Sequence, residues 1–365
     1  MRISIGSKVV DGPWGGGNLF VKNLSSYLKS KGNEVIYDLS KPNIDLILLT
    51  DPRSRKESSS TFNHIEIQKY KELVNENVIV VQRINECDER KFTNNINKYY
   101  LEASHCADHI VFVSSWLRDI YLNLGMRKEK TSVILAGANK AIFNDFNSKI
   151  NIGNEKVNLV THHWSAHKNK GFEIYSKIDS LISKSKWSEK LNFTYIGNMN
   201  SDYNFLNSQI IEPLAGDELA NELKKHHIYI TGSINEPSGN HHIEAAQCGL
   251  PILYKSSGGI PEYCEGFGLS FDNDLEIKLE EMINNYDTYR EKMKQYPFSA
   301  ENMSEKFYDL FLLLAQKRNL DKKSYSRKFA GRLFIYKNKF LVFFRDYLFF
   351  SFRALLHKLF KKVLR

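Results

Sequence analysis

Short apolar runs alternate with longer amphipathic segments along most of this 365-residue chain. Runs of four to eight apolar residues indicate buried strands, whereas apolar residues recurring every three or four positions indicate helices. Because parallel strands need crossover helices between them, this alternation predicts an α/β fold with doubly wound, largely parallel sheets. The strands are expected at 2–8, 34–38, 45–50, 78–82, 110–114, 132–135, 156–161, 192–196, 227–231, 251–254 and 268–271. The helices are expected at 18–31, 65–74, 94–106, 116–124, 172–183, 243–248, 275–296 and 304–317.

A polar run at 144–155 divides this pattern into two similar halves. A chain of this length can fill two separate cores, so we expect two Rossmann-like domains joined by that linker. The first domain is expected at 1–145 and the second at 156–300. A further helix at 301–317 and a tail at 324–365 complete the predicted organisation.

The net charge of +9 is concentrated at one end of the chain. Residues 317–365 carry fifteen Lys or Arg and two acidic residues, which is a net charge of +13 and leaves −4 for the rest. A mildly acidic body argues against a nucleic-acid groove across it. We therefore expect no nucleic-acid partner.

The stretch 236–261 (EPSGNHHIEAAQCGLPILYKSSGGIP) follows an expected strand and contains two glutamates, Glu236 and Glu244, eight positions apart. Glu236 is expected at the carboxyl end of the strand and Glu244 in the first turns of a helix. Unpaired N–H groups at a helix start suit a phosphate, and carboxylates on either side suit sugar hydroxyls. The alternative for the glutamates alone is a capped amphipathic helix with two solvated side chains. The helix is expected to open at Gly239, Asn240 and His241.

These two glutamates, with AAQCGLPIL and GGIPE after them, resemble the donor motif of retaining GT-B glycosyltransferases (group 1, family 4-like). The resemblance covers about residues 1–315. It implies that Glu236 contacts the donor sugar, that Glu244 contacts the nucleotide ribose, and that the amides between them hold the diphosphate. It also implies that the helix at 301–317 crosses back to the first domain.

Lys170, directly before Gly171 and a helix, resembles the diphosphate-binding lysine of the same family. The arginine that usually precedes it by five positions is Ser165 here, and Lys168 is the neighbouring cation. The resemblance implies catalytic roles for Lys170 and Glu236, in which Lys170 and the helix start stabilise charge on the leaving phosphate. The alternative for Lys170 is an ordinary surface lysine in a first helical turn.

Glycines between the first strand and the first helix would allow close approach of a ligand, although a flexible turn fits the sequence alone equally well. In the resembled family this loop reaches the cleft opposite the donor. The glycines are Gly15, Gly16 and Gly17.

The polar segment 82–91 (QRINECDERK) is expected as a loop at a strand end, where open α/β sheets place ligands. Four of its side chains are candidates for the acceptor side of the cleft, and the alternative is a solvated, salt-bridged loop. Many relatives have a sugar-contacting histidine near this strand end, and this segment has none. The candidates are Arg83, Asn85, Asp88 and Arg90.

Paired histidines occur at 162–163, 226–227 and 241–242. Adjacent strand residues point to opposite faces, and no HExxH or spaced carboxylate set accompanies the pairs, so we expect no metal site and no cofactor. The four cysteines lack CxxC spacing and are expected to be reduced thiols.

The tail at 324–365 interleaves basic residues with eleven aromatic residues between Phe329 and Phe360. A helix with basic and aromatic faces suits the plane of an anionic membrane surface, and the charges that interrupt it leave it too short to span. The alternatives are a terminal helix packed on the body and, more remotely, an aromatic platform for single-stranded RNA.

Together these features predict a metal-independent bacterial-type glycosyltransferase that moves a sugar from a nucleotide diphosphate to a lipid-linked or cell-surface glycan acceptor. Retention at the anomeric carbon is implied by the resemblance. The absence of a leader segment predicts a cytoplasmic protein, peripheral on the inner face of the membrane. Two other classes remain open, a GT-B sugar-nucleotide epimerase and a non-catalytic membrane-tethered binding protein.

Overall fold

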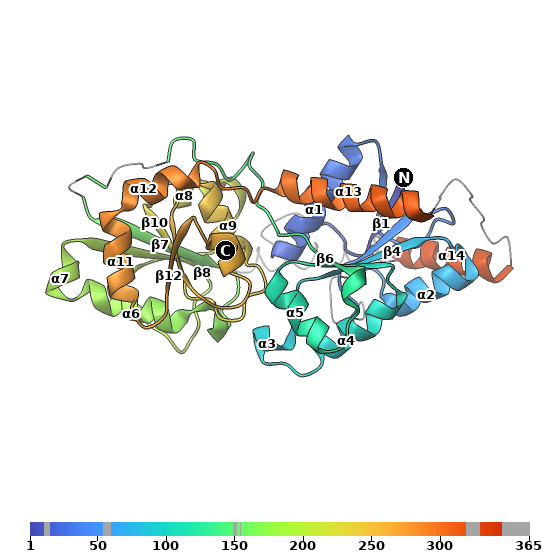
Figure 1. The fold of residues 1–365 in the computed structure, drawn as a ribbon, viewed down its shortest axis with the longest axis horizontal. Coiled ribbons are helices and arrows are strands. Elements are labelled where there is room, and N and C mark those ends of the chain that lie inside the picture. The colour runs from blue at the N-terminus through green and yellow to red at the C-terminus, as the bar shows by residue number, and fades with distance from the viewer. Residues whose placement is uncertain (11–14, 54–59, 149–151, 154, 319–328, 345–365) are drawn as a thin grey trace, which may run out of the picture.

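The computed structural model describes residues 1–10, 15–53, 60–148, 152–153, 155–318 and 329–344. These residues form two domains, each built around a six-stranded sheet with every strand pair parallel. The strand order is β2-β1-β3-β4-β5-β6 in the N-terminal domain and β12-β11-β10-β7-β8-β9 in the C-terminal domain. Figure 1 shows the two domains side by side along the long axis, with helices covering their sheets. The predicted α/β class with two doubly wound sheets is confirmed.

The strands of the N-terminal domain are β1 (Arg2–Ile5), β2 (Glu34–Ile36), β3 (Leu46–Leu49), β4 (Ile79–Ile84), β5 (His109–Phe112) and β6 (Thr131–Val133). Its helices are α1 (Gly16–Ser30), α2 (His64–Leu73), α3 (Asp88–Lys91), α4 (Ile96–Ala103) and α5 (Ser115–Asn123), with short 3-10 turns η1 (Ser104–Cys106) and η2 (Lys128–Lys130).

The strands of the C-terminal domain are β7 (Val157–His163), β8 (Leu191–Gly197), β9 (Gln209–Ile211), β10 (Ile228–Thr231), β11 (Ile252–Lys255) and β12 (Gly268–Phe271). Its helical segments are η3 (Lys168–Lys170), α6 (Phe172–Ile182), α7 (Ser185–Ser188), α8 (Gly216–Leu223), α9 (Asn240–Gln247), α10 (Pro261–Cys264), α11 (Leu275–Asn284) and α12 (Tyr286–Met293). Two helices follow, α13 (Ala300–Arg318) and α14 (Phe329–Phe344).

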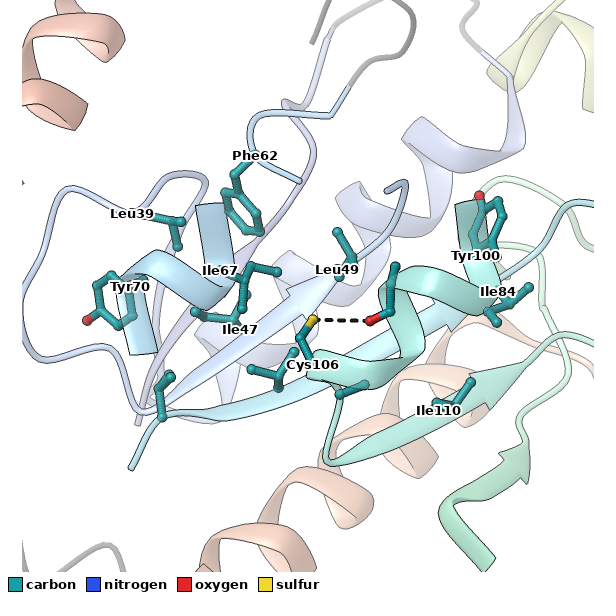
Figure 2. Packing of buried hydrophobic residues seen from close by; sticks show 14 of the residues in the cluster. Leu39, Ile47, Leu49, Phe62, Ile67, Tyr70, Ile84, Tyr100, Cys106 and Ile110 are labelled. Atoms are coloured by element: carbon teal, nitrogen blue, oxygen red, sulfur yellow. Dashed lines mark hydrogen bonds between the residues drawn. The ribbon is translucent and has the colours of Figure 1, made fainter. Parts of the chain in front are cut away.

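The centre of the N-terminal sheet is formed by β3 and β4, in which every residue is buried. One face packs against α2 and α4, in the cluster partly drawn in Figure 2. The other face is covered by α1 and by α13, whose Met303, Phe307 and Phe311 enter the core. Because α13 follows the C-terminal domain in the chain but packs beside α1, it ties the two domains together (Figure 1).

The structure corrects the prediction that the polar segment after residue 82 leaves the sheet. Strand β4 continues to Ile84, and Asp88–Lys91 form a helical turn. Polar side chains are accommodated because Gln82 Nε2 donates to the Tyr100 carbonyl at 3.0 Å, and the Arg83 guanidinium lies 3.9 Å from the Phe20 ring centre. Other differences from the expected elements are the added β9, α7, α8 and α10, and the break of 275–296 into α11 and α12 at Asn285.

Helix α14 is the described part of the predicted tail, and the remainder lies outside the described residues. It packs on α2. Its Ile335 is only 8% exposed, and the ring of its Phe334 lies 6.2 Å from the ring of Tyr70 on α2. This packing agrees with the alternative of a terminal helix on the body for the described part of the tail, and contact with a membrane stays a prediction. Its opposite face is exposed, and the six large apolar residues on it are Phe329, Leu333, Tyr336, Phe340, Phe343 and Phe344.

Candidate active site

Two helix N-termini meet at the boundary between the domains. Helix α9 begins at Asn240 after Gly239, and α1 begins at Gly16 after Gly15, and among the described residues neither has a side-chain cap. A Cβ atom built on Gly16 would lie 3.0 Å from the Asn240 side chain, so the two ends are in close contact. Uncapped N–H groups and two positive dipole ends in one place suit an anionic ligand.

Glu236 lies beside these helix ends and is only 5% exposed. Its Oε2 accepts a hydrogen bond from Lys170 Nζ, and its Oε1 lies 3.2 Å from Arg90 NH2. Burial raises the pKa of the Glu236 carboxyl, but Arg90 and Lys170 outweigh that effect and lower it to about 2. Glu236 is thus a carboxylate at neutral pH, held between two cations.

The backbone of Glu236 is held by the loop that contains GGIP. Gly259 N donates to the Glu236 carbonyl at 2.9 Å, and Asn235 N donates to Ser257 Oγ at 3.0 Å. Gly258 has a φ of +66°, and a Cβ atom there would lie 2.5 Å from the Glu236 carbonyl oxygen. A side chain at this position would therefore force the loop away from Glu236.

Arg90 belongs to the N-terminal domain, and two side chains of the C-terminal domain hold the turn that carries it. Asn169 Nδ2 donates to the Arg90 carbonyl at 2.9 Å, and Asn235 Nδ2 donates to the Glu89 carbonyl at 3.1 Å. Arg90 NH1 also contacts Glu86 Oε2 at 2.9 Å. The sequence placed Arg90 among the candidates for the acceptor side because it lies in a polar run after a strand, whereas the structure places its guanidinium against Glu236.

A second contact between the domains lies beside the GGIP loop. The Glu262 carboxylate accepts hydrogen bonds from Ser115 N at 2.8 Å and Trp116 N at 3.0 Å, and so caps α5 from the other domain. Tyr263 Oη donates to the Val113 carbonyl. The segment that follows the GGIP loop is therefore anchored on the N-terminal domain.

Glu244 is buried in α9, and its Oε2 lies 3.0 Å from His162 Nε2. Three further histidines lie nearby: the His241 ring centre is 6.3 Å from that of His162, 4.6 Å from that of His163 and 4.9 Å from that of His242. Burial lowers the pKa of all three, to about 3 for His242. Within the described residues, no group of three or more His, Cys, Asp or Glu side chains could hold a metal ion.

The candidates at the expected acceptor side have different surroundings. Arg83 is buried against Phe20, and burial lowers its pKa to about 10. Asp88 accepts hydrogen bonds from Ile96 N at 2.8 Å and Asn97 N at 3.0 Å, so it caps the start of α4. Asn85 is half-buried in the segment between β4 and α3.

Ser165 and Lys168, the two residues considered together with Lys170 in the sequence, also have different surroundings. Ser165 Oγ accepts a hydrogen bond from His167 N at 3.2 Å, within the turn that follows β7. Lys168 is exposed, and its Nζ lies 5.1 Å from the Phe92 ring centre. The cation that the structure places against Glu236 alongside Lys170 is thus Arg90 rather than Lys168.

No protein-family model matches the chain. Among curated proteins, the phosphatidylinositol N-acetylglucosaminyltransferase gpi3 subunit of Schizosaccharomyces pombe is 30% identical over 134 residues. This match covers 32% of the chain and 29% of that protein, so it spans under a third of the relative.

Solved glycosyltransferase structures match 85–87% of the chain. Sucrose-phosphate synthase from Thermosynechococcus elongatus has a TM-score of 0.62 at 15% identity, covering 87% of this chain and 99% of that one. A glycosyltransferase from Rickettsia africae has a TM-score of 0.63 at 15% identity, covering 86% and 98%. Anabaena HepE in complex with UDP and glucose has a TM-score of 0.60 at 12% identity, covering 85% and 99%. The chain therefore has the GT-B fold, the two-domain architecture of these glycosyltransferases.

Proposed function

We propose that this chain is a glycosyltransferase whose donor is a sugar on a nucleoside diphosphate. The observation that carries the proposal is the cluster of Glu236, Lys170 and two uncapped helix N-termini at the domain boundary. A partly buried cation and helix ends suit a diphosphate, and an adjacent ionised carboxylate suits sugar hydroxyls. The same fold is found in HepE with UDP bound, which supports a nucleotide donor.

In this proposal Lys170 and the start of α9 stabilise the negative charge that develops on the leaving diphosphate. Glu236 orients the donor sugar through its hydroxyls, and Glu244, aligned by His162, contacts the ribose. The reaction proceeds with retention, with attack and departure on one face of the sugar and the leaving phosphate assisting deprotonation of the acceptor. No metal is required, because the protein itself supplies the cationic groups.

We further propose that the acceptor is lipid-linked or part of a cell-surface glycan and is met at an anionic membrane surface. The exposed face of α14 carries Phe329, Leu333, Tyr336 and Phe340, each more than half exposed, on the side opposite the face packed on α2. This helix has no acidic residue and is flanked by further basic sequence. Aromatic rings with cations beside them suit the headgroup region of an anionic bilayer.

None of the helices within the described residues is long and apolar enough to cross a membrane. Membrane contact through α14 would therefore be made by a helix lying in the interface. Because α14 is packed on α2, it would hold the N-terminal domain, the expected acceptor domain, next to the lipid.

The test is an assay of donor consumption by the full chain with a panel of UDP-, GDP- and ADP-sugars, with and without a membrane-lipid extract. A glycosyltransferase releases nucleoside diphosphate from its donor, releases it faster when the lipid extract supplies an acceptor, and attaches the sugar to a lipid. An epimerase converts the sugar nucleotide without acceptor, and a binding protein leaves every donor intact. Either of the last two results would overturn the proposal.

A further inference from the structure

Five charged side chains alternate in sign across the domain boundary. Lys91 Nζ lies 3.3 Å from Glu86 Oε2, and Glu86 Oε2 lies 2.9 Å from Arg90 NH1. Arg90 NH2 lies 3.2 Å from Glu236 Oε1, and Lys170 contacts the other oxygen of Glu236. Three cations share two carboxylates, which leaves one surplus positive charge beside the uncapped ends of α1 and α9.

Arg90 differs from a surface arginine that pairs with the nearest acid. The carbonyls of Arg90 and Glu89 both accept hydrogen bonds from the C-terminal domain, through Asn169 and Asn235. Asn235 immediately precedes Glu236 and has a left-handed φ of +52°. The turn α3 is thus fixed on the donor domain by its backbone, and this directs the guanidinium to Glu236.

Glu236 brings Arg90 and Lys170 to opposite oxygens of one carboxylate, so both cations lie within reach of a ligand beside it. The partly exposed guanidinium of Arg90 has five N–H donors in a planar fork that matches phosphate oxygens, whereas a lysine offers a single charged centre. In the C-terminal domain, position 165 holds an uncharged serine, and the Lys168 ammonium lies over Phe92.

We propose that Arg90, supplied by the N-terminal domain, is the second cation of the donor's diphosphate site and substitutes for the charge missing at Ser165. This inference rests on the proposed function. It makes high-affinity donor binding depend on contact between the domains, since one of the two cations for the diphosphate comes from each side.

The first measurement is calorimetric affinity for UDP, UMP and uridine, with GDP or ADP and their analogues if the parent prefers another base. Charge-assisted hydrogen bonds to phosphate predict that Arg90→Gln weakens diphosphate binding by about 10- to 100-fold and nucleoside binding by less than about 3-fold. Arg90→Lys should recover part of the loss. Lys91→Gln is the matched control, because it removes a neighbouring charge that contacts Glu86 and does not contact Glu236.

The second measurement separates a phosphate contact from a role in docking the domains. Ser165→Arg in the Arg90→Gln background places a guanidinium in the donor domain but cannot rebuild the pair between Arg90 and Glu86. Recovery of diphosphate affinity to within about 3-fold of the parent is expected for a charge role. Loss that Ser165→Arg does not repair, or equal losses for uridine and UDP, would assign Arg90 to docking alone and overturn the inference.

Binding measurements on the parent chain separate a failure of the proposed function from a failure of the inference about Arg90. If it binds none of the nucleoside diphosphates, the proposed function fails and the inference fails with it. If the parent binds a diphosphate and Arg90→Gln binds it equally well, the inference alone fails. Thermal unfolding of each variant verifies that the loss of affinity is not a loss of fold.

Discussion

Gly16 at the start of α1 lies against Asn240 at the start of α9, with only 3.0 Å between a Cβ atom built on the glycine and the asparagine side chain. The two residues come from different domains and belong to the two sequence features that first indicated a ligand site. Their contact brings the glycine loop to the donor motif.

A side chain at Gly16 should therefore interfere with the site. Gly16→Val would push Asn240 and the start of α9 away, so we expect donor affinity to fall by about 10-fold, a loss of little over 1 kcal/mol. Gly17→Val is the matched control, because a Cβ atom at Gly17 meets nothing within 4 Å. Calorimetry with the preferred nucleoside diphosphate measures both, and equal effects of the two substitutions would contradict the contact.

The two glutamates of the donor motif should have separable effects. Glu236→Ala removes the expected sugar contact, so turnover should fall by more than about 100-fold while the affinity for free nucleotide changes little. Glu244→Ala removes the expected ribose contact and the partner of His162, so nucleotide affinity should fall. Unchanged nucleotide affinity in Glu244→Ala would contradict the ribose assignment.

The buried Glu236 carboxylate should contribute to the pH dependence of stability. Its pKa is lowered from 4.5 to about 2 in the folded chain, so the stabilisation is present above pH 4.5 and is lost as the pH falls toward 2. The shift corresponds to roughly 3 kcal/mol. Denaturant unfolding at several pH values should show a shallower acid decline for Glu236→Gln than for the parent. The exposed Glu189→Gln should follow the parent.

Much of this arrangement follows from residue patterns. The alternation of strands and helices predicted both sheets, because apolar runs such as LILL at β3 can be buried only in the middle of a sheet. Glu236 and Lys170, which the sequence motifs singled out, are in contact in the structure, and their roles toward a donor stay predictions. The short edge strand β9 was missed because QII is brief and partly exposed, and α8 begins at a glycine without a capping side chain.

Contacts between the domains could not be predicted from sequence patterns. Arg90 and Glu236 are 146 positions apart, and neither periodicity nor motif spacing relates residues across a domain boundary. Asp88 shows the converse problem, since an acid after a strand looks the same in sequence whether it faces a ligand or caps the next helix. Packing of the tail on the body was only an alternative because the charge of the tail favoured a membrane surface, whereas Ile335 and Phe334 supply an apolar face that packs on α2.

The exposed face of α14 gives a prediction about membranes. Tyr336→Ser with Phe340→Ser removes two rings that are 67% and 61% exposed without touching the packed face. In sedimentation with phosphatidylglycerol vesicles, the affinity for the vesicles should fall by about 10-fold or more, because each ring that enters the lipid buries apolar area. Leu206→Ser, at an 80% exposed site in the other domain, is the control. Binding that is indifferent to these rings or to lipid charge would leave α14 as a packing helix only.

The cationic site should make the reaction independent of added metal. In the proposed site, Lys170 and the N-termini of α1 and α9 supply the positive charge that a divalent ion would otherwise bring to the diphosphate. Initial rates after treatment with excess EDTA should stay within about 2-fold of untreated enzyme. Activity that disappears with EDTA and returns with Mg²⁺ or Mn²⁺ would contradict this.

The most direct test of the central claim compares two lysines two positions apart in one turn. Lys170 contacts Glu236 beside the helix ends, whereas Lys168 lies over Phe92. If leaving-group charge is stabilised at this site, Lys170→Gln should lower the rate of sugar transfer by about 100-fold or more, and Lys168→Gln should stay within about 3-fold of the parent. Equal transfer rates for the two variants would contradict the placement of the donor diphosphate between the domains.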